Sequence, residues 1–465
     1  MKTSYRIKDM IFPALIPVAV PVLGVPISLV LSSAIHTGQT IRREWIHRGN
    51  RRRGTPTSIP EGAGGQVRTQ DDAVSRLPLH DFAPLPIDGY SSTGIRALPD
   101  IAPMYFDSGR ILRGRLHAYP RHFHETLIPG AGGTPISAML GLHHSKLRRP
   151  GLLIVHGLMN SKRQDLVRIV TLRAYYEWGF NVCAIDLRGF GRSAELASAP
   201  SGAGGIETED VMSVLRYLRG FSHFTSLGLL GFSLGGGTVL NAAAHKDAEA
   251  LIDGGVMAIS PPINFEAALE RFEQKPPDEE HLLTFHFFRY LLQRSLKHAE
   301  IMKWVKRKLK ASGQEPKVES FYDYLQNLVA LGYLGQGHRR ELSPDKLLEL
   351  LLKVSSPRRS LPKVKVPTFI LHAKDDPLCQ INGDDIAFMA RVANANPHFR
   401  YHVTELGGHT AYVVVNPSWF YKMVGTYFTY WGQWETSKRD PFEGLSPEAL
   451  GFGRARTGKD NPGKP

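Results

Sequence analysis

A serine flanked by glycines is the first feature of this sequence that could do chemistry. Ser233 is the third residue of the run Gly231-Phe232-Ser233-Leu234-Gly235, which two further glycines follow. An apolar stretch precedes the run, and a helical pattern follows it. Glycines on both sides permit a sharp, strained turn that lifts the hydroxyl out of a sheet and sets it at a helix N-terminus. The motif predicts that Ser233 is a nucleophile.

A histidine in a glycine turn is the expected partner of this serine. A serine hydroxyl is a poor nucleophile unless a base stands beside it. The chain has 19 histidines, and His409 differs from the others because it ends the turn Gly407-Gly408-His409 after the last apolar strand. We expect His409 to swing toward the cleft and to act as the general base.

An acid must hold the imidazole in the correct tautomer and stabilise the imidazolium. Asp375 and Asp376 follow an apolar strand that starts at Val366. We favour Asp376, because the Pro377 and aliphatic residue that follow it fit the frame of such an acid. Asp375 remains the alternative and would otherwise cap the turn. The resulting order of serine, acid and histidine is that of one known triad arrangement.

The oxyanion of an acyl-transfer transition state needs preorganised N–H donors. The backbone N–H of Leu234, directly after the serine, is one candidate. The second is expected in the loop His156-Gly157-Leu158-Met159-Asn160, with the N–H of Leu158 as the donor. We expect His156 to shape this loop and not to take part in the chemistry.

Other motifs do not point to a cofactor or a metal. The loop Asp186–Ser193 lacks both Gly-x-Gly-x-x-Gly and a Lys-Ser/Thr pair, so nucleotide binding is rejected. Five histidines lack the companions that a zinc site requires, so they are expected to be structural: His117, His122, His124, His143 and His144. Two distant cysteines, Cys183 and Cys379, make no disulfide framework.

Strand and helix patterns alternate from about residue 100 onward, which favours a mostly parallel twisted sheet covered by helices on both faces. Strands are expected at 136–142 (an edge-side strand), 151–156, 181–186, 226–232, 255–260, 366–372 and 399–405. Helices are expected at 165–178, 206–219, 235–245, 383–395 and 417–431.

A helical insertion interrupts this alternation at residues 262–362. It contains an aromatic stretch at 285–292 and a basic amphipathic stretch at 301–310. An insertion of this size between two strands is expected to form a cap over the site, with the aromatic side chains lining an apolar pocket. The basic stretch would lie against anionic lipid, or would simply be a solvated helix face.

The N-terminal 40 residues are expected to be a membrane anchor or a signal segment. Residues 11–31 carry no charge, and as a helix they would rise roughly 31 Å, enough for a bilayer core. The more basic flank follows the stretch, which places the catalytic domain in the cytoplasm. The alternative is export after cleavage near Ser32-Ser33-Ala34. Residues 41–100 are read as a linker or a segment draped on the domain, residues 101–435 as the catalytic domain, and residues 436–465 as a disordered tail.

The net charge of +14 is concentrated in two segments. Residues 1–60 carry nine Lys or Arg against two acids, and residues 294–317 carry eight against two. Such patches suit either nucleic acid or an anionic membrane. We expect a membrane surface and no nucleic acid; the sequence leaves the oligomeric state open.

Over about residues 100–435 the chain resembles the α/β-hydrolase superfamily. The resemblance is carried by HGLMNSK (156–162), DLRGFGRS (186–193), GFSLGG (231–236), HAKDDP (372–377) and GGH (407–409). Three further segments resemble the YheT-like, ABHD-type branch: the GxSLGG elbow, Phe-Tyr-Asp-Tyr (321–324) and Ser-Ser-Pro (355–357). The resemblance implies an α/β-hydrolase fold and a membrane-anchored esterase or lipase that acts on acyl lipids.

The sequence therefore predicts a serine hydrolase that cleaves carboxylic ester or thioester bonds of a hydrophobic substrate through an acyl-enzyme, without a cofactor. An acyltransferase with the same triad and an inactive binding protein on the same fold are the two alternatives.

Overall fold

The computed structural model describes residues 68–82, 119–143, 148–158, 160–196, 200–273, 300–313, 321–330, 343–376, 378–410, 412 and 416–432. The N-terminal segment 1–40, most of the linker 41–100 and the tail 436–465 lie outside the described residues. Among the helices that are described, none has the length and apolar character needed to cross a bilayer. The stretch 11–31, for which an anchor was predicted, lies outside the described residues.

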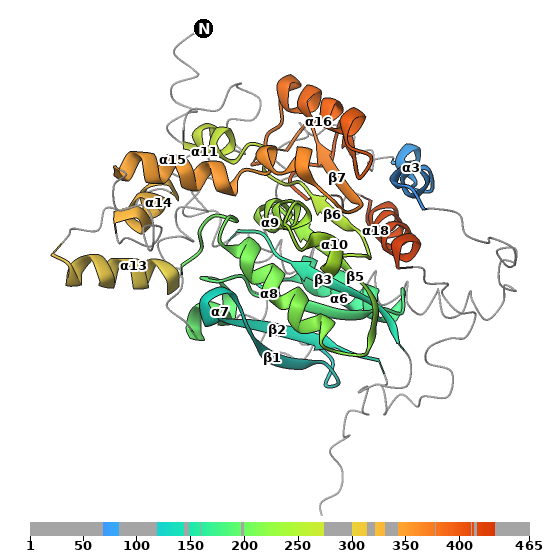
Figure 1. The fold of residues 1–465 in the computed structure, drawn as a ribbon, viewed down its shortest axis with the longest axis horizontal. Helices are drawn as coiled ribbons and strands as arrows, with labels where there is room; N and C mark the ends of the chain where they lie inside the picture. Colours follow the sequence, from blue (N-terminus) through green and yellow to red (C-terminus); the bar gives the residue numbers. More distant parts are fainter. Residues whose placement is uncertain are drawn as a thin grey trace, which may run out of the picture.

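Eight strands form one twisted sheet in the order β1-β2-β4-β3-β5-β6-β7-β8 (Figure 1). β1 pairs with β2 and β2 with β4 antiparallel, and the remaining neighbours are parallel. The mostly parallel sheet is therefore as predicted. The strands are β1 (His124–Pro129), β2 (Pro135–Gly141), β3 (Arg149–Val155), β4 (Asn181–Ile185), β5 (Phe224–Phe232), β6 (Val256–Ile259), β7 (Thr368–Ala373) and β8 (Phe399–Thr404).

The edge of the sheet differs from the prediction. The strand expected at 136–142 to lie on the edge side is β2, which lies between β1 and β4. The strand at this edge is β1, which the sequence analysis missed because only Ile128 of its residues is fully buried. A strand with this little apolar burial gives almost no alternating pattern to detect.

Helices cover both faces of the sheet. One face packs against α8 (Glu207–Arg219), α9 (Leu234–Ala243) and α16 (Gly383–Ala395), and the other against α6 (Asp165–Tyr176) and α18 (Pro417–Trp431). Along β3, Leu153 and Val155 belong to the first core while Leu152 and Ile154 belong to the second. Burial on both faces explains why the parallel strands are continuous apolar runs.

The predicted helical insertion lies between β6 and β7. Its described helices are α11 (Phe265–Glu273), α13 (Glu300–Ala311), α14 (Phe321–Ala330) and α15 (Pro344–Ser355). They gather on one side of the molecule, with α13 at its outer end (Figure 1). The aromatic stretch at 285–292 lies outside the described residues.

A short helix, α3 (Gln70–Ser75), lies within the range read as a linker or a draped segment. The Gln70 side chain donates to the Thr368 carbonyl at 2.8 Å, and the Trp419 indole of α18 donates to the Pro78 carbonyl at 2.6 Å. Ala73 is fully buried in the core on the sheet face that α6 and α18 cover. Residues 68–82 are therefore packed as part of the domain.

Candidate active site

Ser233 lies at the sharp turn between β5 and α9. Its φ of 52° and ψ of −120° are a strained conformation for a non-glycine residue. A Cβ on Gly231 would lie 2.3 Å from the Gly235 carbonyl oxygen, and one on Gly235 would lie 2.3 Å from the His156 carbonyl oxygen. The two glycines are therefore required by close backbone contacts, as the sequence motif predicted.

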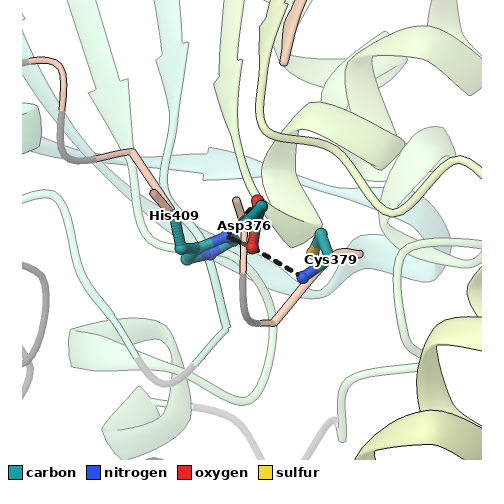
Figure 2. A group of neighbouring side chains, drawn as sticks. All are labelled: Asp376, Cys379 and His409. Carbon is teal, nitrogen blue, oxygen red and sulfur yellow. Dashed lines mark hydrogen bonds and ion pairs between the residues drawn. The ribbon is translucent and has the colours of Figure 1, made fainter. Parts of the chain in front are cut away.

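His409 and Asp376 form a buried pair (Figure 2). Because a carboxylate can only accept, His409 Nδ1 donates to Asp376 Oδ2 at 2.9 Å and approaches Oδ1 at 3.1 Å. Asp376 Oδ1 also accepts from the backbone N–H groups of Leu378 and Cys379, both at 2.8 Å. The Asp376 side chain is fully buried and that of His409 is 8% exposed. Of the two candidate acids, Asp376 is the one that holds the imidazole.

The charges of this pair support each other. Burial alone would raise the pKa of Asp376, but the charge and hydrogen bond of His409 lower it below its ordinary value. Burial would likewise lower the pKa of His409, but the Asp376 carboxylate raises it well above its ordinary value. The site is therefore built to keep Asp376 ionised and to stabilise an imidazolium.

Three contacts hold the His409 turn in place. Asp375 Oδ1 accepts from the Gly408 N–H at 2.8 Å, so the other aspartate ties the acid loop to the histidine loop. The Ser260 hydroxyl accepts from the Thr410 N–H at 3.3 Å. The Tyr412 ring packs so tightly under Gly407 that a Cβ there would lie 2.4 Å from it.

The predicted oxyanion loop lies against the nucleophile. A Cβ on Gly157 would lie 3.0 Å from the Ser233 Cβ, so no side chain fits between them. His156 Nε2 accepts from the Leu187 N–H at 3.0 Å, and Nδ1 donates to the Gly157 carbonyl at 2.6 Å. His156 therefore shapes the loop, as predicted. Leu158 follows Gly157 directly and is half-buried, while Leu234 is buried at the start of α9.

A buried ionic cluster, formed by Lys162, Asp186 and Glu125, fixes the far end of this loop. The fully buried Lys162 ammonium contacts Asp186 Oδ2 at 2.5 Å and Glu125 Oε1 at 2.9 Å. The Lys162 backbone N–H donates to Asp186 Oδ1 at 2.6 Å, and the Arg192 N–H donates to Oδ2 at 2.9 Å. The carboxylate of the Asp186–Ser193 motif thus joins two loops of the protein.

Cys379 is a residue of the site that the sequence analysis missed. Burial raises the pKa of its thiol. Ligating atoms of Asp376, Cys379 and His409 all lie within 4.8 Å of one another. The only signal in the sequence was its position three residues after Asp376. The Ser233 N–H donates to the Ile259 carbonyl at 2.9 Å and the Thr410 N–H donates to the Ser260 hydroxyl, so the serine turn and the histidine turn meet at the end of β6.

Three of the five histidines that were expected to be structural lie in the described residues. His143 stacks on Tyr175 with ring centres 3.9 Å apart, and burial lowers the pKa of His143 to about 4. His122 lies at hydrogen-bonding distance, 3.1 Å, from the Tyr176 hydroxyl. His124 begins β1 and is exposed. His117 and His144 lie outside the described residues.

The sheet order, the serine elbow at β5 and the Asp376–His409 pair beyond β7 and β8 define an α/β-hydrolase. Residues 149–412, more than half of the chain, match the family Hydrolase_4, described as serine aminopeptidase, S33. The protein belongs to this family. The narrower resemblance to the YheT-like branch stays a prediction.

The chain is similar to a curated relative and to several solved structures. It is 22% identical over 265 residues to monoacylglycerol lipase of Saccharomyces cerevisiae, over 57% of this chain and 55% of the relative. The chain thus spans about half the length of that relative. A Pyrococcus furiosus esterase matches with a TM-score of 0.42 and 16% identity, over 67% of this chain and 93% of its own. A membrane phospholipase A described as a bacterial virulence factor matches at 0.41 and 18%, over 73% and 97%.

Proposed function

We propose that the protein is a serine hydrolase that cleaves carboxylic ester or thioester bonds of a hydrophobic acyl substrate. The observation that carries the proposal is the buried Asp376–His409 pair, whose histidine turn meets the Ser233 turn at the end of β6. A buried carboxylate, an imidazole and a strained serine have no packing reason to meet, whereas nucleophilic catalysis needs all three.

In the proposed reaction, the Ser233 hydroxyl attacks the carbonyl carbon while His409 Nε2 takes the hydroxyl proton. The N–H groups of Leu158 and Leu234 hold the oxyanion. The tetrahedral intermediate collapses, the alcohol or thiol leaves with the proton from His409, and the acyl group stays on Ser233. His409 then removes a proton from water, which attacks the acyl-enzyme and releases the acid. Asp376 stays ionised throughout.

Two observations support a hydrophobic acyl substrate. The curated relative is a monoacylglycerol lipase. The helical insertion beside the site supplies apolar faces, and α14 and α15 contribute buried residues to the core that continues under α9. We propose that apolar side chains of this insertion contact the acyl chain, because such binding sites are lined mainly by hydrophobic side chains.

A fluorophosphonate probe, which phosphonylates an activated serine, tests the reaction class. We expect the wild-type chain to be labelled and Ser233→Ala not to be. A series of esters of increasing acyl length should be hydrolysed by the wild type and lost in Ser233→Ala by at least about 10³-fold. Absence of both labelling and turnover in the folded wild type would favour the inactive binding protein. Transfer of the acyl group to an added alcohol in preference to water would favour the acyltransferase.

We also propose that α13 lies against an anionic membrane surface. Its Val305 and Leu309 are buried, whereas Arg307 and Lys310 are exposed. A helix with one apolar face packed on the domain presents its basic face outward, where acidic lipid head groups attract it. In this proposal, residues 11–31 anchor the chain with the domain in the cytoplasm; export after signal cleavage is the alternative.

Vesicle binding tests whether the basic residues of α13, and not basic residues in general, bind the membrane surface. We expect Arg307→Gln with Lys310→Gln to weaken sedimentation with vesicles that contain phosphatidylserine. The matched control is Lys363→Gln with Lys365→Gln, which removes two exposed charges elsewhere. An equal loss in both double variants would contradict a role for α13. Protease protection of the tail in membrane preparations would decide the orientation.

A further inference from the structure

The buried thiol of Cys379 has no part in the proposed reaction, although it lies beside the groups that do. The residue is 8% exposed. Its backbone N–H donates to Asp376 Oδ1 at 2.8 Å, which fixes its place next to the acid. Its Sγ and the ligating atoms of Asp376 and His409 all lie within 4.8 Å of one another. A soft sulfur and an imidazole nitrogen thus lie close together in a buried site.

The imidazole is already oriented as a metal-binding histidine would be. His409 Nδ1 is bound to Asp376, so Nε2 is the ring nitrogen that remains for a ligand. Metal-binding histidines usually donate their second nitrogen to a carboxylate, which fixes the ring and raises its basicity. Asp376 holds His409 in this manner with both of its oxygens near Nδ1.

We propose that Cys379 Sγ and His409 Nε2 form a binding site for a thiophilic divalent cation of the Zn²⁺ class. The Ser233 hydroxyl or a water completes the coordination, and Asp376 remains the outer partner of His409. On binding, the Cys379 thiol releases its proton to solvent and a metal–thiolate bond forms, with no change of oxidation state. No electron donor or acceptor is needed.

The donor set and its spacing select the class of cation. Atoms of Asp376, Cys379 and His409 lie within 4.8 Å of one another, so small side-chain shifts suffice to bring Cys379 Sγ and a His409 nitrogen onto one cation with bonds of about 2.0–2.3 Å. Sulfur and imidazole nitrogen suit Zn²⁺ and its softer relatives, while Mg²⁺ and Ca²⁺ prefer oxygen. With fewer protein ligands than a structural zinc site, this site should bind reversibly.

A cation bound at this site would inhibit the enzyme, and this consequence rests on the proposed function. The nitrogen that accepts the Ser233 proton would be bound to the cation, so the serine could not be activated. Binding of the cation itself does not depend on the reaction. The two statements can therefore be separated by experiment.

Calorimetric titration of the full chain with ZnCl₂ tests the site directly. We expect Cys379→Ser to remove the tightest binding event, weakening it at least tenfold. Cys183→Ser is the matched control, because Cys183 is the other buried cysteine and lies in β4, away from the site. Ser233→Ala should retain the event. Equal binding by the wild type and Cys379→Ser would overturn the proposal.

A spectroscopic experiment controls for misfolding of the Cys379→Ser variant. Cobalt(II), added in place of zinc, should give a sulfur-to-metal charge-transfer band in the wild type and in Cys183→Ser, and none in folded Cys379→Ser. Absence of the band in the folded wild type would also overturn the site.

The functional arm uses the fluorophosphonate probe. Zn²⁺ should slow labelling of the wild type, EDTA should restore it, and Mg²⁺ at equal concentration should have no effect. Cys379→Ser should be labelled at the same rate with or without Zn²⁺. If the wild type is never labelled, the proposed function fails while calorimetry still decides the metal site.

Discussion

Lys162 and Asp186 are joined twice inside the protein, once through the Lys162 ammonium at 2.5 Å and once through its backbone N–H at 2.6 Å. The first contact neutralises a buried charge, and the second fixes the backbone of the loop that begins at His156. This electrostatic pair therefore helps to fix the loop that carries Leu158, one of the two predicted oxyanion donors, although neither residue belongs to the predicted triad.

Breaking this pair should damage both stability and activity. We expect Lys162→Met to lower the free energy of unfolding by about 3–5 kcal/mol, because it leaves a buried carboxylate without its partner. The displaced loop should lower kcat for ester hydrolysis by up to about 10²–10³-fold, the range for a lost oxyanion donor. Urea unfolding and steady-state kinetics measure the two effects. Arg163→Met is the matched control, because Arg163 is 60% exposed and also pairs with Glu125. Similar losses in both variants would contradict the role of Lys162.

The two neighbouring aspartates should behave differently. Asp376→Asn is expected to lower kcat about 10⁴-fold, because the amide cannot stabilise the imidazolium or fix its tautomer. Asp375→Asn should cost no more than about 1 kcal/mol, roughly fivefold in kcat, because its amide oxygen can still accept from the Gly408 N–H. Kinetics of the two purified variants decide this. A larger loss in Asp375→Asn would reverse the assignment.

The pH dependence of the reaction follows from the charge of Asp376. The general base must be neutral to accept a proton, so activity is lost as the pH falls through the pKa of His409. Because Asp376 raises this pKa well above 6.5, the acid limb of kcat/KM in the free enzyme should lie above pH 6.5. In Asp376→Asn the residual activity should show its acid limb at lower pH, since the carboxylate charge is gone. A limb that does not move would show that another group controls it.

The stability of the ionic cluster should depend on pH in the acid range. Burial alone would raise the pKa of Glu125, but its contact with Lys162 lowers it from 4.5 to about 2. The contribution to stability is therefore present above pH 4.5 and is lost as the pH falls from 4.5 toward 2. Urea unfolding between pH 2 and 6 should show a shallower decline for Glu125→Gln than for the wild type. Parallel curves would mean that Glu125 has an ordinary pKa.

The strained backbone at Ser233 should lower the stability of the fold in exchange for the position of the nucleophile. Ser233→Gly should be more stable than Ser233→Ala by about 1 kcal/mol, because glycine adopts a φ of 52° without a clash. Both variants lack the nucleophile, so the difference reports the backbone alone. Urea unfolding of the pair measures it, and a glycine variant no more stable than the alanine variant would argue against stored strain.

The chain sequence was enough to predict the elements that have strong local patterns. The parallel strands are continuous apolar runs. Ser233 lies in a glycine motif that is needed for a sharp strand–turn–helix connection and for few other local structures. The pairing of Asp376 with His409 followed from their positions after consecutive strands. Strand β1 was missed because only one of its residues, Ile128, is fully buried. Cys379 was missed because its place in the site depends on the approach of His409, which lies far along the chain, and local sequence does not encode that contact. Lys162 and its partners Glu125 and Asp186 come from three separated segments and could not be paired from spacing alone.

The helical insertion leaves the sheet after β6 and returns at β7, yet these two strands stay paired in register from Val256 with Thr368 to Ile259 with Leu371. The insertion therefore begins and ends at neighbouring strands and leaves the pairing of the sheet intact. Evolution could exchange this segment for another of different length and chemistry while the reacting groups remain untouched. Chimaeras that graft a relative's insertion between these two strands would then inherit the donor's substrate preference together with the recipient's chemistry.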